Sequence, residues 1–313
     1  MQPKDVGGRV LAGDRRAVAR AISMVEDGSD ALPALSAELY PRTGHAWTLG
    51  LTGSPGVGKS SLAEQIVKTV RALGRTVAVL AIDPTSPFTG GALLGDRVRM
   101  QAHATDPGVF IRSMATRGHL GGMALAAPEA IRVLDASGKD LVIVETVGVG
   151  QSEVEVAAAT DTTVVAVAPG WGDAVQASKA GILEIADVFV VNKADRDGAA
   201  ETVRDLRNML RMGPRTEWEP PIVKTSTVTG DGISELWEAV ERHRSFLTDS
   251  GELERRRSRR ILTEVEAMVA ERLRARASGL LRSEALDGLA AALAERSLDP
   301  YAAADQLMAQ LTM

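Results

Sequence analysis

The sequence contains no cysteine, and this absence alone excludes several kinds of protein. A chain of 313 residues without thiols has no disulfide framework, no cysteine-based zinc site and no thiol nucleophile. Aromatic residues make up only 3% of the chain, so leucine, valine, alanine and isoleucine must fill most of any core. The formal net charge of −5 argues against nucleic-acid binding, which usually requires a basic excess.

Long apolar runs are also missing. None approaches the ~18 residues of a membrane-spanning helix, and the first residues, MQPKDVGGRVLAGDRR, lack the apolar centre of a signal peptide. We therefore expect a cytoplasmic protein. What the chain does contain is typical of a globular protein, because 45% hydrophobic and 25% charged residues allow a packed core.

Short β-branched runs alternate with segments of helical pattern between about residues 45 and 247. Several of these runs are apolar at successive positions, which is typical of strands buried on both faces of a parallel sheet. The helical segments are long enough to connect parallel strands, so we expect a three-layer α/β fold with a mainly parallel central sheet. The seven runs are WTLGLTG, TVAVLAID, VFIRSMA, LVIVETVG, TVVAVAPG, VFVVNKAD and PIVKTSTV.

Both ends of the chain lack strand patterns. The early segment RRAVARAISMVED has apolar residues near helical spacing, and three helical patterns follow beyond about residue 250. A helical tail of this length needs a surface to pack against, either its own core or a second subunit. We expect an N-terminal helical extension over residues 1–44, a nucleotide-binding domain over 45–250 and a C-terminal helical arm over 251–313.

The segment GSPGVGKSS follows an apolar run and opens a helical one, and it matches the P-loop pattern G-x-x-x-x-G-K-[ST]. Small residues let backbone N–H groups surround phosphates, and a helix N-terminus adds partial positive charge. We expect Lys59 to reach the β- and γ-phosphates and Ser60 to coordinate Mg²⁺, within a P-loop NTPase fold. The predicted phosphate-binding residues are Gly53, Ser54, Pro55, Gly56, Val57, Gly58, Lys59, Ser60 and Ser61, together with Gly148.

Magnesium prefers oxygen ligands, and three acidic residues are candidates to lie near the phosphates. Asp83 ends a strand run, Asp96 lies in LGDRVRM, and Glu145 opens ETVGVGQSE, where many GTPases have aspartate. Asp83 precedes a proline, so it is also typical of a turn. Asp96 by itself is also typical of a helix cap or a solvated charge.

The segment VVNKAD places Asn192, Lys193 and Asp195 just beyond an apolar strand run. A carboxylate at this position can accept the N1 and N2 protons of guanine together, whereas adenine has no N2 amine. The stem of Lys193 can lie along the ring plane. The later segment TSTVTG adds Ser226 and Thr227 to the expected base-binding loop. These motifs follow the P-loop in GTPase order, so we predict GTP rather than ATP as the nucleotide.

With these motifs placed, the chain resembles the methylmalonyl-CoA mutase-associated GTPases, the MeaB/ArgK group that includes the human MMAA protein. This group belongs to the SIMIBI class of P-loop GTPases. The resemblance rests on four long stretches, at residues 81–100, 110–122, 145–153 and 169–187. It implies a homodimer with helical extensions at both ends, in which residues 251–313 form the dimerisation arm.

The resemblance also implies a function. Members of the family act as chaperones that gate adenosylcobalamin loading into a cobalamin-dependent acyl-CoA mutase through GTP, and that protect this enzyme. Carried over position by position, the magnesium and switch residues would be Ser60, Asp83, Asp96 and Glu145. A further mobile switch would lie between residues 170 and 181, with Asp173, Gln176 and Lys179 as its polar residues. The pattern AVQASKAGILEI alone favours an ordinary amphipathic helix in this place.

Val149 stands where many GTPases have a water-positioning glutamine, so we expect slow intrinsic hydrolysis that a partner accelerates. The predicted catalytic residues are Lys59, Asp96, Glu145 and Lys179. The sequence leaves open which of these groups, or which part of the 170–181 loop, orients the attacking water.

Three other functions stay open. A nucleotide-dependent interaction module with negligible hydrolysis would also fit Val149. A metal-insertion GTPase is disfavoured because the chain has no cysteine and only four scattered histidines. A P-loop kinase is disfavoured because such kinases rarely need guanine selectivity.

The basic run ERRRSRR is most simply a solvated helix face, with a partner contact as the alternative. The roles of Arg117 and Trp171 are open.

Overall fold

The computed structural model describes residues 5–84, 103, 105–116, 122–146, 151–170, 184–213, 216–281 and 287–311. It divides into two compact units, Met1–Arg260 and Ile261–Met313. The first unit contains the whole described sheet and the N-terminal helices. The second contains most of the helical tail.

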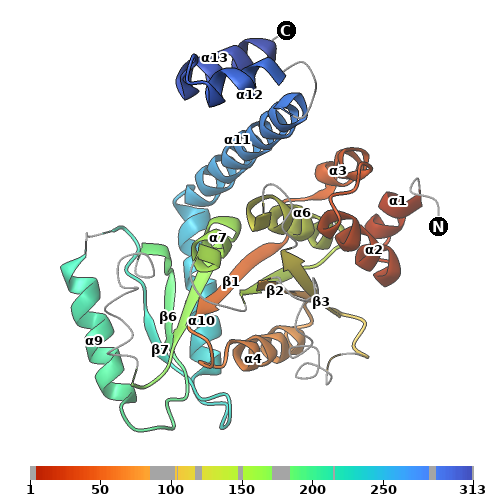
Figure 1. Ribbon diagram of the computed structural model, residues 1–313. Coiled ribbons are helices and arrows are strands. Elements are labelled where there is room, and N and C mark those ends of the chain that lie inside the picture. Colours follow the sequence, from red (N-terminus) through yellow and green to blue (C-terminus); the bar gives the residue numbers. More distant parts are fainter. Residues whose placement is uncertain are drawn as a thin grey trace. The chain divides into compact units, whose positions relative to one another are not determined.

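A parallel sheet forms the centre of the first unit (Figure 1). Among the described residues it has seven strands in the order β3-β2-β4-β1-β5-β6-β7, and every neighbouring pair is parallel. This confirms the predicted α/β fold, and each of the seven predicted runs overlaps one strand, although several runs extend beyond it. The strands are β1 (Trp47–Gly53), β2 (Val77–Pro84), β3 (Val109–Thr116), β4 (Leu141–Thr146), β5 (Thr162–Val167), β6 (Val188–Val191) and β7 (Ile222–Lys224).

Helices cover both faces of the sheet, because alternate strand residues point to opposite sides and both sets are apolar. On one face, α4 (Lys59–Ala72) and α10 (Ile233–Asp249) pack over β1 and β4. On the other face lie α6 (Gly122–Ala136) and α7 (Gln151–Ala159), while α9 (Ala199–Met212) covers β5 and β6. The result is the predicted three-layer arrangement.

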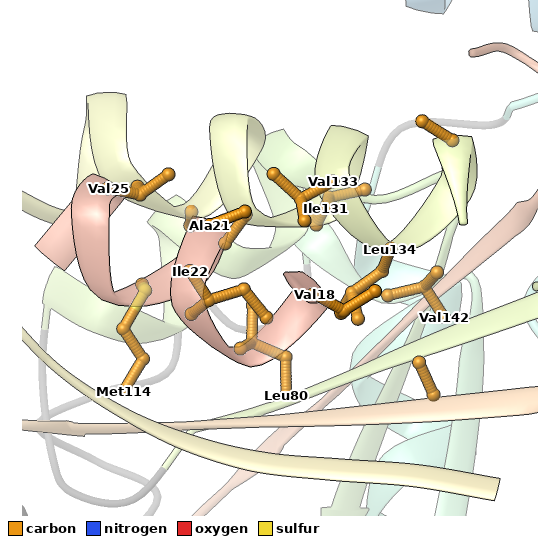
Figure 2. Packing of buried hydrophobic residues seen from close by; sticks show 14 of the residues in the cluster. Val18, Ala21, Ile22, Val25, Leu80, Met114, Ile131, Val133, Leu134 and Val142 are labelled. Atoms are coloured by element: carbon orange, nitrogen blue, oxygen red, sulfur yellow. The ribbon is translucent and has the colours of Figure 1, made fainter. Parts of the chain in front are cut away.

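The predicted N-terminal helical segment is part of this first unit. Its buried side chains join those of α6 and the strands in one core, and Figure 2 shows Ile22, Leu80 and Leu134 in that layer. Asp14 caps the second helix by accepting hydrogen bonds from the backbone N–H groups of Arg16 and Ala17. The elements are α1 (Val6–Leu11), α2 (Arg15–Glu26), α3 (Leu32–Leu39) and the 3₁₀ turn η2 (Tyr40–Arg42).

The helical tail consists of α11 (Glu252–Leu281), α12 (Asp287–Ala294) and α13 (Pro300–Leu311), as the sequence predicts. In the second unit, Leu289 and Ala303 form a small core with partly buried leucines around them. No helix within the described ranges has the length and apolarity needed to cross a membrane.

The prediction that ERRRSRR is a solvated face is wrong for three of its arginines, which all lie in the first unit. Arg257 makes two hydrogen bonds to the fully buried carboxylate of Asp161, at 3.1 and 2.6 Å. Arg260 adds a third at 3.3 Å, and Arg256 pairs with buried Asp187 at 3.1 Å. Asp161 directly precedes β5 and Asp187 directly precedes β6. The N-terminal part of α11 is therefore bonded to the amino-terminal edge of the sheet.

Candidate functional site

The P-loop joins the end of β1 to the start of α4, and two of its glycines are required by close contacts. Gly53 has φ 129°, and a Cβ there would lie 2.0 Å from the carbonyl oxygen of Ala166. Gly58 has φ 95°, and a Cβ there would lie 2.6 Å from Nδ2 of Asn192. The backbone can therefore pack against β5 and the base-binding loop only with glycine at these positions.

Lys59 begins α4 and is only 7% exposed. Its Nζ donates hydrogen bonds to the carbonyl oxygens of Gly53 at 2.6 Å and Ser54 at 3.3 Å. The ammonium group is therefore held above the loop, at the N-terminus of a 14-residue helix. A helix N-terminus and a lysine charge together form an anion-binding site.

Ser60, in the first turn of α4, contacts Glu145 of β4. The hydroxyl of Ser60 donates to Oε1 of Glu145 at 2.7 Å, and the exposed fractions of these residues are 8% and 1%. Glu145 stands opposite Leu51 in the β1–β4 register, which brings its carboxylate to the first turn of α4. A hydroxyl and a carboxylate beside a phosphate-binding loop are the oxygen donors that Mg²⁺ uses, with phosphate oxygens and water filling its other positions. The donor chemistry therefore fits magnesium.

The structure leaves several predicted residues undescribed. Asp83 is the penultimate residue of β2, opposite Ala115 of β3, but its side chain lies outside the described part. The other predicted or open residues outside it are Asp96, Arg117, Gly148, Val149, Trp171, Asp173, Gln176 and Lys179.

Asn192 follows β6 and connects the two ends of the site. It is fully buried, its Nδ2 donates to the carbonyl of Val57 at 2.7 Å, and its Oδ1 accepts from Thr225 at 3.1 Å. The next residue, Lys193, has a left-handed φ of 58°, and its Nζ donates to the carbonyl of Gly56 at 2.6 Å. The loop predicted to bind the base thus lies directly on the P-loop.

Asp195 is exposed beyond this junction. A hydrogen bond from the Ser226 hydroxyl holds the pKa of its carboxyl below the ordinary value, so the group stays ionised at neutral pH. The loop that carries Ser226 is ordered by its own backbone: Ser226 N–H donates to Asp231 at 3.0 Å, and Gly230 N–H donates to Ser226 at 2.8 Å. An ionised carboxylate held by a hydrogen bond from an ordered loop is the acceptor that the N1 and N2 protons of guanine require.

One further side chain contacts this region. Gln65, in the second turn of α4, donates from Nε2 to the carbonyl oxygen of Thr227 at 3.3 Å. It ties the helix that follows the P-loop to the loop expected to hold the base. No sequence motif indicates this contact, because the two residues are 162 positions apart.

A phosphate cradle, a magnesium-type oxygen pair and a guanine-type carboxylate thus gather at the carboxyl edge of one parallel sheet. This combination of fold and site defines a P-loop GTPase. The chain belongs to the family described as methylmalonyl Co-A mutase-associated GTPase MeaB, whose family model matches residues 18–280.

Curated relatives agree with this membership. The chain is 49% identical over 316 residues to a putative GTPase of Pyrococcus horikoshii, covering 99% of each chain. It is 40% identical over 256 residues to GTPase ArgK of Escherichia coli, covering 79% of this chain and 77% of that protein. It is also 37% identical over 268 residues to the mitochondrial methylmalonic aciduria type A homolog of Caenorhabditis elegans, covering 79% and 67%.

A solved structure extends the match to the fold. The crystal structure of a LAO/AO transport system kinase superposes with a TM-score of 0.72 at 28% identity, covering 99% of this chain and 98% of that one. The family resemblance and the SIMIBI class are thereby confirmed. The chain is a GTPase that binds GTP and GDP.

Proposed function

We propose that this GTPase is a nucleotide-dependent chaperone of a cobalamin-dependent acyl-CoA mutase, with methylmalonyl-CoA mutase as the first candidate, and that it gates adenosylcobalamin loading. The observation that carries the proposal is the MeaB family model, which spans residues 18–280 and bears the mutase association in its description. The relative in Caenorhabditis elegans, named for methylmalonic aciduria, supports the same partner.

Hydrolysis by such a site depends on positioning and charge neutralisation more than on covalent chemistry. Lys59 would exchange its bonds to the carbonyls of Gly53 and Ser54 for phosphate oxygens. Ser60 and Glu145 would hold Mg²⁺, with Asp83 and Asp96 as further proposed ligands. The bound ion would neutralise charge on the β- and γ-phosphates. The remaining work of the chain is to place GTP and water.

Placement of the attacking water is the step that we propose to depend on the partner. Val149 cannot orient water through a hydrogen bond, since its side chain is a hydrocarbon. Asp96, Glu145 and the polar residues of the 170–181 loop are the proposed substitutes, with Lys179 stabilising the developing charge. Intrinsic turnover is then slow, and ordering of this loop by the mutase accelerates it.

A homodimer formed through the tail completes the proposal. Apolar side chains of α11 are exposed in the second unit, and Leu262 has an exposed fraction of 69%. They recur about one helical turn apart, as an interface stripe does. The others are Ile261, Val265, Val269 and Leu273. Substitution of Leu262 and Val265 by glutamate should convert the dimer to a monomer in light scattering, and an unchanged mass would contradict the assignment.

The decisive experiment combines binding with single-turnover hydrolysis. The chain should co-purify with a cobalamin-dependent mutase from its source, and GTP hydrolysis should accelerate at least ~10-fold when the purified mutase is added. Asp195→Asn is the matched control, because it removes the guanine contact without altering the described phosphate cradle. Binding without acceleration would favour an interaction module with negligible hydrolysis. If the chain shows neither binding to the mutase nor acceleration by it, the proposed partner is excluded.

A further inference from the structure

Two buried hydroxyl groups lie between the P-loop and the loop that begins at Glu145. Thr52 is the last residue of β1 before Gly53, and Thr146 directly follows Glu145 at the end of β4. Both threonines have an exposed fraction of 0%, and the Thr146 hydroxyl donates to Oγ1 of Thr52 at 3.2 Å.

The hydroxyl pair connects β1 and β4 beyond the point where their backbone pairing ends. The register between β1 and β4 runs as far as Leu51 opposite Glu145. Beyond this level β1 continues against β5 and β4 continues against β2. Thr52 and Thr146 therefore link the two strands by side chains at the level where each gives way to a nucleotide-binding loop.

The Thr52–Thr146 link and the Ser60–Glu145 contact lie on opposite faces of β4. Successive strand residues point to opposite sides, so Glu145 faces α4, where Ser60 contacts it, and Thr146 faces away. Two adjacent residues of β4 are thus each bonded to the segment made of β1, the P-loop and α4. Because contacts hold the strand on both faces at this level, the backbone that carries the Glu145 carboxylate has little freedom to rotate or shift.

We propose that Thr52 and Thr146 are positioning residues, which set the place of Glu145 relative to the P-loop and thereby the magnesium-dependent part of catalysis. The inference concerns the hydrolysis common to the family and does not depend on the proposed mutase partner. The chemistry of the pair supports a role beyond packing. The first four residues of β4, Leu141–Val144, are all apolar, and valine fills nearly the same space as threonine without burying a hydroxyl.

A set of valine variants separates positioning from packing. Each single variant, Thr52→Val or Thr146→Val, leaves one hydroxyl buried without its described partner and should lower the Tm by about 3 °C. The double variant removes both hydroxyls and should recover most of that loss, since replacing both partners by apolar groups is nearly neutral. Thr146→Ser keeps the donor and is the conservative control.

The readouts are single-turnover GTP hydrolysis without partner, its Mg²⁺ dependence, and the affinity for GDP measured with EDTA. In the double variant we expect hydrolysis to fall about 10-fold and the Mg²⁺ concentration for half-saturation to rise several-fold. The tightening of a non-hydrolysable GTP analogue by Mg²⁺ should shrink in parallel. GDP affinity in EDTA should stay within about twofold of the original, because the phosphate and base contacts do not include this pair.

A stable double variant with unchanged hydrolysis and Mg²⁺ dependence would overturn the proposal and leave the pair a packing role. Loss of GDP binding in EDTA would overturn it as well, because the cradle itself would then depend on the hydroxyls. Failure of Thr146→Ser to retain the original Mg²⁺ dependence would also count against it, since the donor is still present.

Discussion

The side-chain amide of Asn192 donates a hydrogen bond of 2.7 Å to the backbone carbonyl of Val57, which joins the predicted base-binding loop to the P-loop. A Cβ on Gly58 would also lie only 2.6 Å from the nitrogen of this amide. The P-loop and the predicted base-binding loop are therefore directly connected. A change at the junction should affect the phosphate and the base contacts together.

The first prediction compares two alanine substitutions in the P-loop. Gly58→Ala introduces strain at φ 95° and also displaces Asn192, whereas Gly56→Ala has φ 76° and nothing within 4 Å of the new Cβ. Gly56→Ala should cost about 1 kcal/mol of stability from backbone strain alone. Gly58→Ala should cost more and lose most GDP affinity, as measured by calorimetry. Equal effects of the two variants would show that the Asn192 contact is unimportant.

Asp195→Asn tests the base end. Loss of a carboxylate that accepts two protons from guanine should weaken GTP binding by about 2 kcal/mol, or roughly 30-fold. Magnesium dependence should persist, because Ser60 and Glu145 are unaltered. Asp197→Asn, an exposed acid two residues further on, is the control and should bind GTP normally. Unchanged GTP affinity in Asp195→Asn would remove this residue from the base site.

Gln65→Met tests the contact that motifs do not indicate. Methionine keeps the length of the side chain but cannot donate to the Thr227 carbonyl, so the base-binding loop should loosen and GDP affinity fall about fivefold. Lys68→Met lies on the same helix and removes only an exposed ion pair with Glu64, so it should change affinity little. If both variants bind GDP alike, the tether has no role in binding.

Lys179→Ala tests the proposed partner-ordered loop. If this lysine stabilises charge that develops during hydrolysis, the mutase-stimulated rate should fall at least ~100-fold in single-turnover assays. The same variant assayed without mutase shows how much of the effect belongs to stimulation. A stimulated rate equal to that of the original chain would exclude the loop from catalysis at this residue.

The sequence predicted the fold because its determinants are local. Apolar runs such as LVIVET and the helical stretches between them report burial and periodicity directly, and the structure confirms the α/β architecture. The site motifs are also local, since GSPGVGKSS and VVNKAD each span a few residues. Contacts between distant residues left no such pattern. Asn192 and Val57 are 135 positions apart. Nothing in the sequence shows that the Asn192 amide bonds to the backbone carbonyl of Val57 rather than to another group.

The arginines of α11 show the same limit on a charged segment. A run of basic residues on a helix is usually solvated, so pattern alone favoured that interpretation. Its outcome depends on where buried acids lie in three dimensions. Asp161 is 96 positions from Arg257 and precedes a strand, where nothing in the sequence indicates that its carboxylate is fully buried.

A further prediction concerns the ion pair between Asp161 and these arginines. Asp161→Asn leaves the partly buried guanidinium groups of Arg257 and Arg260 without a carboxylate, and should lower the free energy of unfolding by about 3 kcal/mol. Arg255→Ala breaks an exposed pair with Glu252 on the same helix and should cost less than about 1 kcal/mol. Urea denaturation measures both, and similar losses would mean that burial of Asp161 adds nothing.

The effect of Asp161→Asn should also depend on pH. Burial raises the pKa of Asp161, but the guanidinium groups of Arg257 and Arg260 outweigh burial and hold that pKa below its ordinary value. A carboxyl whose pKa is lower in the folded chain than in the unfolded chain stabilises the fold at pH values above its unfolded pKa of about 3.9. This contribution is lost as the pH falls through the folded pKa. The difference between the original chain and the variant should therefore be constant from about pH 7 to about pH 5 and shrink below about pH 4. A difference that grows on acidification would mean that the carboxyl is protonated in the folded chain.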